Sequence, residues 1–477
     1  MADVSQTTPP TRRERDSMGE MVVPAGAYYG ASTQRAVLNF PISGIGMPRR
    51  FIWALGTIKQ GAAIVNCELG LLDSKFASAI AQAAQEVAEG RFDDQFPVDV
   101  FQTGSGTSTN MNANEVIANR ASELLGGELG AKRLVHPNDQ VNLGQSSNDV
   151  IPSAMHLAAL ATLGEDLEPA LDRLAKVLLD KSHEFWSIIK TGRTHLQDAT
   201  PIRLGQEFLG YAGQVQRAKQ RLERARADLS ELALGGTAVG TGINTHEEFA
   251  ARVTAWISAQ TGIQVTETTN HFQAQSTIDG VVSFSGAVRS VAISLMKIAN
   301  DFRFLAMGPR AGLGELFLPE VQPGSSIMPG KVNPVIAESL IQVVAQVLGN
   351  DATIATSGQW GFFELNLMMP VAAFNLLQEM TLLGRAAANF ADQCVVGIQA
   401  TSRGPALVEQ GLAIATALAP VIGYDKAAAI AKAAAKSGQT VREVAREQTS
   451  LSEAELNELL NPEKQVQPGL GGGPAGG

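Results

Sequence analysis

Apolar residues recur at helical spacing over two unusually long stretches of the chain. From Leu204 to Leu232 they follow in alternating steps of four and three residues, which places them on one face of a helix. A second stretch of the same kind runs from Val281 to Phe302. At about 1.5 Å per residue these helices would be roughly 30–45 Å long, a length typical of a helix bundle or coiled coil. The apolar positions between the ends are Phe208, Tyr211, Val215, Ala218, Leu222, Ala225 and Leu229 in the first stretch and Phe284, Val288, Val291, Leu295 and Ile298 in the second.

The long helices divide the chain into a centre and two smaller flanks. Residues 1–143 mix short helices with turn-rich segments, which predicts a mixed, mostly helical N-terminal domain. Residues 144–402 form the predicted helical bundle, and residues 403–465 form a small helical domain. Residues 466–477 offer one leucine among glycines, so we expect a disordered tail. Further helices are predicted around 153–185, 335–349, 371–390, 426–437 and 453–460.

The composition narrows the class of protein. Of the 477 residues, 45% are hydrophobic and only 18% are charged, less than the usual quarter, so we expect extensive burial between subunits. The formal net charge of -10 argues against a nucleic-acid partner, which needs a basic face. The two cysteines, Cys67 and Cys394, have neither a metal spacing nor a redox spacing. This fits a reducing cytoplasm.

No segment of the sequence has the pattern of a targeting or membrane signal. The stretch from Met1 to Asp16 lacks the apolar core of a signal peptide. The longest largely apolar run, Gly411 to Gly423, is too short to span a bilayer and is broken by Pro420. We therefore expect a cytoplasmic protein with no membrane partner.

The segment from Gly324 to Pro334 carries the strongest sign of chemistry. Its two glycines and two prolines forbid a continuous helix or strand, so its polar side chains must lie on an irregular loop. Lys331 can neutralise a carboxylate, Asn333 can hydrogen-bond one, and Ser325 or Ser326 could exchange a proton. A surface turn with incidental polarity is the plain alternative. The segment predicts a site for a small anionic substrate.

Four further polar clusters each have a chemical and a structural interpretation. The first could bind a ligand through exposed amides and hydroxyls or could cap a helix, and the second could be an ordinary turn. The third resembles a helix N-terminus, where capping and anion binding are both natural. The fourth places a histidine, the side chain best suited to proton transfer near neutral pH, just ahead of the longest helix. The clusters are Gly104-Ser105-Gly106-Thr107 running into Asn110, Asn112 and Asn114, His136-Pro137-Asn138-Asp139, Gln145-Ser146-Ser147-Asn148-Asp149 and Gly192-Arg193-Thr194-His195-Leu196-Gln197-Asp198.

These five segments resemble the fumarase and aspartase superfamily, and the resemblance runs from about Asp16 to Pro468. GSSIMPGKVNP, from Gly324 to Pro334, is similar to the superfamily signature but does not choose the substrate. The segments 103–107, 146–149 and 234–242 are similar to the fumarase forms, where aspartases tend to read QGGAGT and STND in the first two. The resemblance therefore favours the class II fumarases.

The resemblance implies a lyase that hydrates fumarate reversibly to L-malate in the tricarboxylic acid cycle, without metal or cofactor. It implies a mainly α, three-domain fold whose long-helix bundle forms a tetrameric helical core of twenty helices. In such homotetramers each active site is assembled from three subunits.

The resemblance also implies roles for individual residues. Ser325 matches the catalytic base, His195 matches the partner that protonates the leaving hydroxyl with a water, and Glu338 matches the carboxylate that orients this histidine. Lys331 and Asn333 would stabilise the carbanion formed during the reaction. The implied substrate-binding residues are Ser105, Gly106, Thr107, Ser146, Ser147, Asn148, Thr194, Ser326, Lys331, Val332 and Asn333. A second anion site would comprise His136, Pro137, Asn138 and Asp139.

Two alternatives stay open at the level of sequence. An aspartate ammonia-lyase would share the signature loop, and the ending from Leu456 to Pro462 resembles some aspartases. Gly144 and the segment 335–337 also depart from many fumarases. A catalytically inactive structural protein on the same fold is the second alternative, although all five polar clusters are intact.

Overall fold

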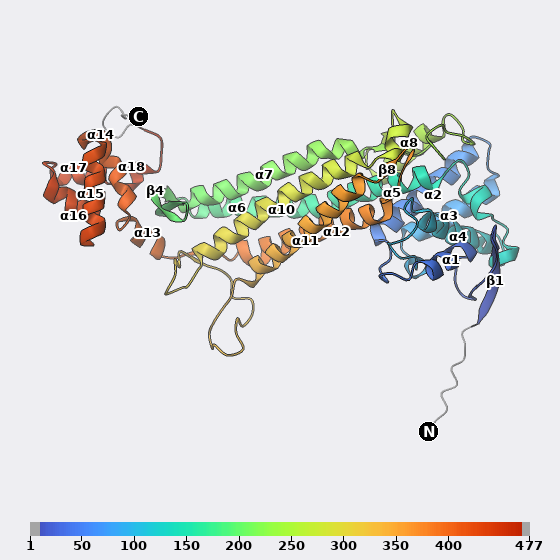
Figure 1. Ribbon diagram of the computed structural model, residues 1–477, viewed down its shortest axis with the longest axis horizontal. Helices are drawn as coiled ribbons and strands as arrows, with labels where there is room; N and C mark the ends of the chain where they lie inside the picture. The colour runs from blue at the N-terminus through green and yellow to red at the C-terminus, as the bar shows by residue number, and fades with distance from the viewer. Residues whose placement is uncertain (1–9, 470–477) are drawn as a thin grey trace, which may run out of the picture. The chain divides into compact units, whose positions relative to one another are not determined.

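The computed structural model describes residues 10–469, most of which lie in helices (Figure 1). The chain forms two compact units. Unit 1 comprises the residues up to Pro169 together with Gln220–Ala292 and Ala345–Gly384, and unit 2 comprises Ala170–Lys219, Ile293–Val344 and the residues from Arg385 onward. The domain boundaries predicted at residues 143 and 402 stay a prediction. From Leu470 onward, the tail predicted to be disordered lies outside the described residues.

Unit 1 is helical apart from short strand pairs. Its strands are β1 (Thr11–Asp16), β2 (Gly19–Pro24), β5 (Glu231–Leu232), β6 (Thr266–Glu267), β8 (Gly361–Phe362) and β9 (Leu365–Asn366). Its α-helices are α1 (Ala31–Asn39), α2 (Arg49–Glu68), α3 (Ser74–Ala88), α4 (Thr107–Leu124), α5 (Ser147–Thr162), α8 (Phe249–Thr261) and α9 (His271–Ser276). Single helical turns are η1 (Asp93–Gln95), η2 (Gly130–Lys132), η3 (Pro137–Val141) and η4 (Leu163–Leu167).

Unit 2 has two strand pairs and a group of short helices. Its strands are β3 (Ile189–Thr194), β4 (Gln197–Arg203), β7 (Leu316–Phe317) and β10 (Gln399–Ala400). Its helices are α13 (Arg403–Val408), α14 (Ala419–Ile422), α15 (Tyr424–Ser437), α16 (Val441–Gln448), α17 (Glu453–Leu459) and α18 (Pro462–Gln465), with η5 (Ala391–Val395) and η6 (Leu412–Leu418). No sheet within residues 10–469 exceeds two strands, and the mainly α class is confirmed.

Each boundary between the residue ranges of the two units falls inside a helix, and five helices are divided in this way. These are α6 (Glu168–Glu184), α7 (Leu204–Leu229), α10 (Asp279–Leu305), α11 (Val335–Gly358) and α12 (Met369–Phe390), the longest of which are labelled in Figure 1. Every apolar position predicted for the stretches 204–232 and 281–302 is buried. The first predicted stretch extends beyond its helix. Helix α7 ends at Leu229, and Leu232 lies in strand β5.

Helix α10 is long and apolar enough to cross a membrane by length and composition alone. The sequence interpretation overlooked this because it considered only uninterrupted apolar runs. Within the protein, Val281, Phe284, Val288 and the later members of the apolar stretch are fully buried. A core helix passes the same test, so the hydropathy of α10 is weak evidence for a membrane span.

Within unit 2, aromatic side chains of α7, α10 and α12 pack against one another. Phe302 of α10 stacks on Phe208 of α7 with ring centroids 5.3 Å apart and on Phe390 of α12 at 5.6 Å. Tyr211 meets both Phe208 and Phe302 edge-on. Such pairs add about 0.5–1.5 kcal/mol each beyond the burial of their area.

Helices α15, α16 and α17 share a small apolar core with η6. It contains Leu418, Ile430 and Val444 together with Leu456 and Leu460, all nearly inaccessible. Helices were predicted at 426–437 and 453–460, and α15 and α17 confirm both. Capping boxes at Thr440 and Ser452 fix where α16 and α17 begin.

The helices of the N-terminal segment are longer than the short ones that we predicted. Helix α2 has 20 residues, and two glycines let its neighbours approach closely. A Cβ at Gly56 would meet the carbonyl oxygen of Ala84 on α3 at 2.8 Å, and one at Gly61 would meet the ring of Trp256 on α8 at 2.6 Å. Since α2 is apolar on several faces, it shows no single amphipathic period that would have revealed its length.

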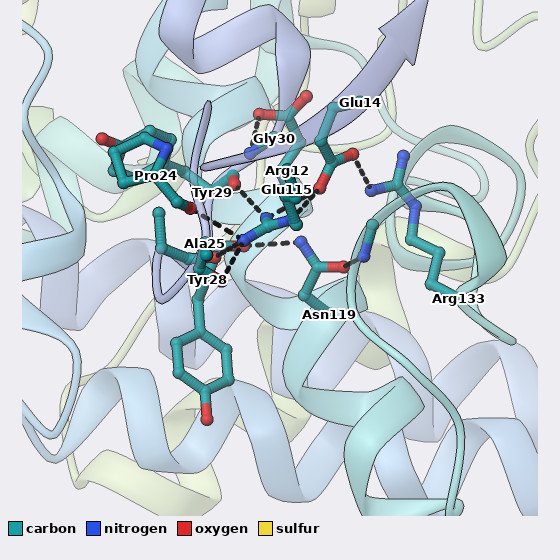
Figure 2. Close-up of polar contacts among 12 residues, drawn as sticks. Arg12, Glu14, Pro24, Ala25, Tyr28, Tyr29, Gly30, Glu115, Asn119 and Arg133 are labelled. Atoms are coloured by element: carbon teal, nitrogen blue, oxygen red, sulfur yellow. Dashed lines mark hydrogen bonds and ion pairs between the residues drawn. The ribbon is translucent and has the colours of Figure 1, made fainter. Parts of the chain in front are cut away.

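A buried polar network anchors the β1–β2 hairpin (Figure 2). The guanidinium of Arg12 donates to the backbone oxygens of residues 24, 25, 27 and 29 and to Glu14. Glu14 also accepts from Arg133 at 2.9 Å. Glu115 of α4 accepts from the amides of residues 30, 32 and 33, and Asn119 donates to the oxygen of residue 28. The hairpin is therefore linked to α4 through the segment 24–33 that follows it in the chain.

One buried carboxylate in unit 1 has no such partners. Glu379 of α12 is fully inaccessible, and neither of its carboxylate oxygens is hydrogen-bonded to a described residue. Nearby, Asp351 of α11 accepts from Ser285 at 2.9 Å and from Arg289 at 2.7 Å, both on α10. Burial raises the pKa of Glu379 well above its ordinary value, and the charge of Asp351 adds to this rise. The nearby Ser285 hydroxyl and the charge of Arg289 offset only part of it.

Replacing Glu379 by glutamine should stabilise the protein at alkaline pH. Because the pKa is raised in the folded state, the folded protein holds a proton that the unfolded chain has lost, so stability falls as pH rises above about 4.5. Glu379→Gln removes this loss and should raise the free energy of unfolding by about 1–3 kcal/mol at pH 8, with a smaller gain near pH 5. Urea unfolding at several pH values measures the difference.

The control is Glu128→Gln, because the side chain of Glu128 is 70% exposed and its only ion pair with a described residue is a 3.6 Å contact with Lys132. Its effect should stay within about 0.5 kcal/mol at every pH. A Glu379→Gln protein that is less stable than wild type at pH 8 would contradict the assignment.

Candidate active site

Two helix N-termini converge in unit 1 and gather three hydroxyls. Helix α4 begins after Gly106, and α5 begins after Ser146. The Thr107 Oγ1 lies 2.7 Å from the Ser147 Oγ and 2.8 Å from the Ser105 Oγ. Free backbone amides and the positive ends of two helix dipoles favour an anion here. The structure thus brings the first and third sequence clusters together.

Glycine is required where the first cluster enters α4. A Cβ at Gly104 would lie 2.0 Å from the carbonyl oxygen of Leu367, and the Gly104 carbonyl itself accepts from the Met369 amide at 3.1 Å. Gly106 has a left-handed backbone with φ of 72°, a conformation that other residues adopt at a cost. The glycines therefore position Ser105 and Thr107 through backbone geometry.

Asp149 fixes the N-terminus of α5. Its Oδ1 accepts from the Ser146 amide at 2.9 Å, which completes a capping box with Ser146, and its Oδ2 accepts from the amides of Gly235 at 3.0 Å and Thr237 at 2.9 Å. Burial raises the pKa of Asp149, and these three amides partly offset that effect. The neighbouring Asn148 donates to the Ala238 oxygen at 2.8 Å. Capping, the plain interpretation of the third cluster, is therefore present, and it also positions Ser147 and Asn148.

A buried amide cluster joins asparagines of the first sequence cluster to Lys59 and Asn142, two partners that the sequence interpretation missed. The Asn142 Oδ1 accepts from Lys59 of α2 at 2.8 Å, from Asn114 at 3.1 Å and from Asn110 at 3.2 Å. Burial lowers the pKa of Lys59 to about 7. The sequence shows this cluster only as asparagines at every second position from 110 to 114. Nothing in the sequence pairs these asparagines with Lys59.

The second cluster forms one exposed turn in unit 1. His136 caps η3, where its Nδ1 accepts from the Asp139 amide at 3.2 Å and lies 3.1 Å from the Asp139 carboxylate. Pro137 is buried at the first position of the turn, and Asn138 is exposed. This geometry agrees with an ordinary turn, and the second anion site stays a prediction.

The fourth cluster forms the tip of a β-hairpin in unit 2. Thr194 of β3 pairs with Gln197 of β4, so His195 and Leu196 alone make the turn. Both have positive φ, 56° and 60°, and both side chains are exposed. His195 is thus presented to solvent on a short, twisted loop.

The signature loop of unit 2 is irregular, as its glycines and prolines predict. The Ser325 Oγ accepts from the amides of Met328 at 2.9 Å and Ile327 at 3.2 Å. The side-chain amide of Asn333 donates from Nδ2 to the backbone oxygen of Gly324 at 2.6 Å, which joins the two ends of the loop. The loop lines a hollow of about 410 Å³ to which Ser325 and Lys331 contribute.

The remaining predicted residues lie next to this loop. Ser326 and Val332 are exposed on it, and Glu338 lies in the first turn of α11. Within residues 10–469 no hydrogen bond or ion pair joins His195 to Ser325 or to Glu338. No group of three or more His, Cys, Asp or Glu side chains in the described part of the chain could hold a metal ion.

Comparison with known proteins identifies the family. The family model described as "Lyase" matches residues 19–349, and the model described as "Fumarase C C-terminus" matches residues 414–466. The chain is 58% identical to the class II fumarate hydratase of Halobacterium salinarum, covering 96% of this chain and 98% of that protein. It is 53% identical to the mitochondrial fumarate hydratase of Rattus norvegicus, covering 96% and 90%.

Solved structures agree with the sequence comparison. The class II fumarase from Schistosoma mansoni superposes with a TM-score of 0.94 at 40% identity, covering 96% of this chain and 99% of that one. The family model that matches residues 19–349 contains all five polar clusters described above. The chain therefore belongs to the class II fumarate hydratase family of lyases.

Proposed function

We propose that the protein catalyses the reversible hydration of fumarate to L-malate. The observation that carries the proposal is the convergence of the α4 and α5 N-termini at Thr107 and Ser147, which suits a carboxylate. The names of the relatives support this substrate, and the fumarase forms of the segments 103–107 and 146–149 favour it over aspartate.

The substrate carboxylates would be bound by short hydroxyl and amide side chains. In unit 1 the binding groups are those of Ser105, Thr107, Ser146, Ser147 and Asn148, together with the backbone of Gly106. From unit 2 we assign Thr194, Ser326, Lys331, Val332 and Asn333 to the same task. The groups of one active site would come from several copies of the chain in a homotetramer, which the low charged fraction of 18% supports.

Ser325 would act as the base in the malate-to-fumarate direction. Its oxygen takes the C3 proton, and the resulting carbanion spreads its charge into the neighbouring carboxylate, where Lys331 and Asn333 stabilise it. A serine alkoxide is scarce at neutral pH. The two amides that donate to the Ser325 Oγ stabilise negative charge on that oxygen and support this role.

The leaving hydroxide departs from C2 as water. His195, with a bound water, would supply the proton, and Glu338 would orient the imidazole. Ser325 then releases its proton to solvent and the His195 side regains one from solvent, which restores the enzyme after a turnover. In the hydration direction each proton moves the opposite way. We further propose a cytoplasmic location, a second anion site at His136–Asp139, and the three domains predicted from the sequence.

The substrate assignment is tested with purified protein. Fumarate formation, followed by its ultraviolet absorbance, should be rapid with L-malate and at least about 1000-fold slower with L-aspartate, because discrimination between buried polar groups reaches this range. Turnover of aspartate without turnover of malate would replace the proposal by an aspartate ammonia-lyase. Turnover of neither would favour the inactive structural protein.

The assignment of base and acid is tested by two variants. Ser325→Ala and His195→Asn should each lower kcat by roughly 100- to 10,000-fold, the range of general acid–base catalysis, while the thermal unfolding midpoint stays near that of wild type. Steady-state kinetics with malate and fumarate provide the measurement. The matched controls are Ser437→Ala and His183→Asn, which alter exposed residues of α15 and α6. Near-normal turnover in either test variant would remove that residue from the mechanism.

A further inference from the structure

The turn that presents His195 has an unfavourable sequence for its geometry. Two-residue hairpin turns with positive φ at both positions strongly prefer Asn-Gly or similar pairs. Here the two positions are His195 at 56° and Leu196 at 60°. A leucine in this conformation costs energy and is maintained only where the surroundings hold the backbone. Some part of unit 2 must therefore fix this turn.

A buried charge cluster lies at the base of the turn. Arg193, the neighbour of Thr194, donates from Nη2 to the Oε1 of Glu315 at 2.6 Å. The Nζ of Lys190, three residues before Arg193 in β3, lies 3.2 Å from the Oε2 of Glu315 and 2.9 Å from the Oε1 of Glu207. Lys190 and Glu315 are 1% and 2% exposed, so solvent weakens these contacts little. Glu315 thus bridges both cations of the hairpin.

Glu315 is itself held rigidly by its backbone. Its amide donates to the Leu305 oxygen at 2.8 Å, where α10 ends, and its carbonyl accepts from the Thr401 amide at 3.0 Å. It directly precedes β7, which pairs with β10. The carboxylate is therefore a fixed point, and the hairpin is attached to it through Arg193 and Lys190.

We propose that Glu315 is a positioning residue for His195. Its buried carboxylate holds Arg193, and through Arg193 it keeps the strained His195–Leu196 turn in one orientation. Glu315 contacts no reacting atom, and the inference rests on the role of His195 under Proposed function. The plain structural alternative is that the cluster only stabilises the fold of unit 2.

The test compares Glu315→Gln with a matched variant at the other end of the hairpin. Glutamine keeps the shape of the side chain but loses the charge that holds Arg193, so kcat should fall roughly tenfold or more while KM changes less than about threefold. The control Glu463→Gln removes the 2.6 Å ion pair between Glu463 of α18 and Arg203 at the far end of β4. It should leave kcat and KM unchanged.

Hydrogen–deuterium exchange supplies a readout that does not depend on turnover. Amides of residues 193–198 should exchange at least about tenfold faster in Glu315→Gln than in wild type and Glu463→Gln. If wild type fails to act on malate, the proposed function fails, yet this measurement still decides whether Glu315 holds the turn.

A second variant acts on the turn itself. Leu196→Gly removes the backbone strain, so it should raise the thermal unfolding midpoint and lower kcat by giving His195 more freedom. In the Glu315→Gln background the same change should lower kcat much less, because the turn is already released. This variant decides the question if Glu315→Gln does not fold.

The proposal is overturned by any of three results. One is a folded Glu315→Gln protein with normal kcat. The second is loss of kcat without faster exchange in residues 193–198. The third is a Leu196→Gly protein with unchanged kcat.

Discussion

Backbone outside helices and strands has amide groups without backbone partners. The candidate site depends on side-chain oxygens that accept hydrogen bonds from these amides. Asp149 accepts three amides and joins the start of α5 to the segment at Gly235 and Thr237. Ser325 accepts two amides in the signature loop. Without these acceptors the buried or clustered amides would each cost about 1–3 kcal/mol, and the segments would adopt other conformations. The positions of the reactive groups thus follow from the hydrogen bonds of backbone next to them.

Buried carboxylates in this protein differ in what surrounds them. Burial raises the pKa of both Asp149 and Glu379. Asp149 receives three amide donors in return, whereas Glu379 receives no hydrogen bond from the described residues. Glu315 accepts from Arg193 and lies beside Lys190, so its charge is matched by cations. A buried acid is therefore a positioning element only where donors or cations oriented by the fold surround it.

The sequence predicted those features that depend on local spacing. The apolar stretches 204–232 and 281–302 were found because helical periodicity repeats every few residues, and the irregular signature loop was found because glycine and proline act locally. Contacts across long separations could not be predicted. Nothing local pairs Lys59 with Asn142, Glu115 with the amides of residues 30–33, or Glu315 with Arg193. In the sequence these charged residues are indistinguishable from surface charges, since burial is decided by the rest of the fold.

The same long-range contacts determine how the proposed catalytic side chains are oriented. The types and local setting of the residues pointed to His195 and to Ser325 or Ser326, and the family resemblance selected Ser325. The orientation of His195 depends on groups such as Glu315 that no motif contains. A serine or histidine on a free loop would sample many orientations, and each turnover would have to select the productive one at an entropic cost. In the proposed mechanism, the two amides on the Ser325 oxygen and the Glu315 carboxylate that holds Arg193 would remove that search before substrate binds. Backbone strain at Leu196 is then the expected cost of preorganisation, because a glycine at this position would relax the turn and give His195 more freedom.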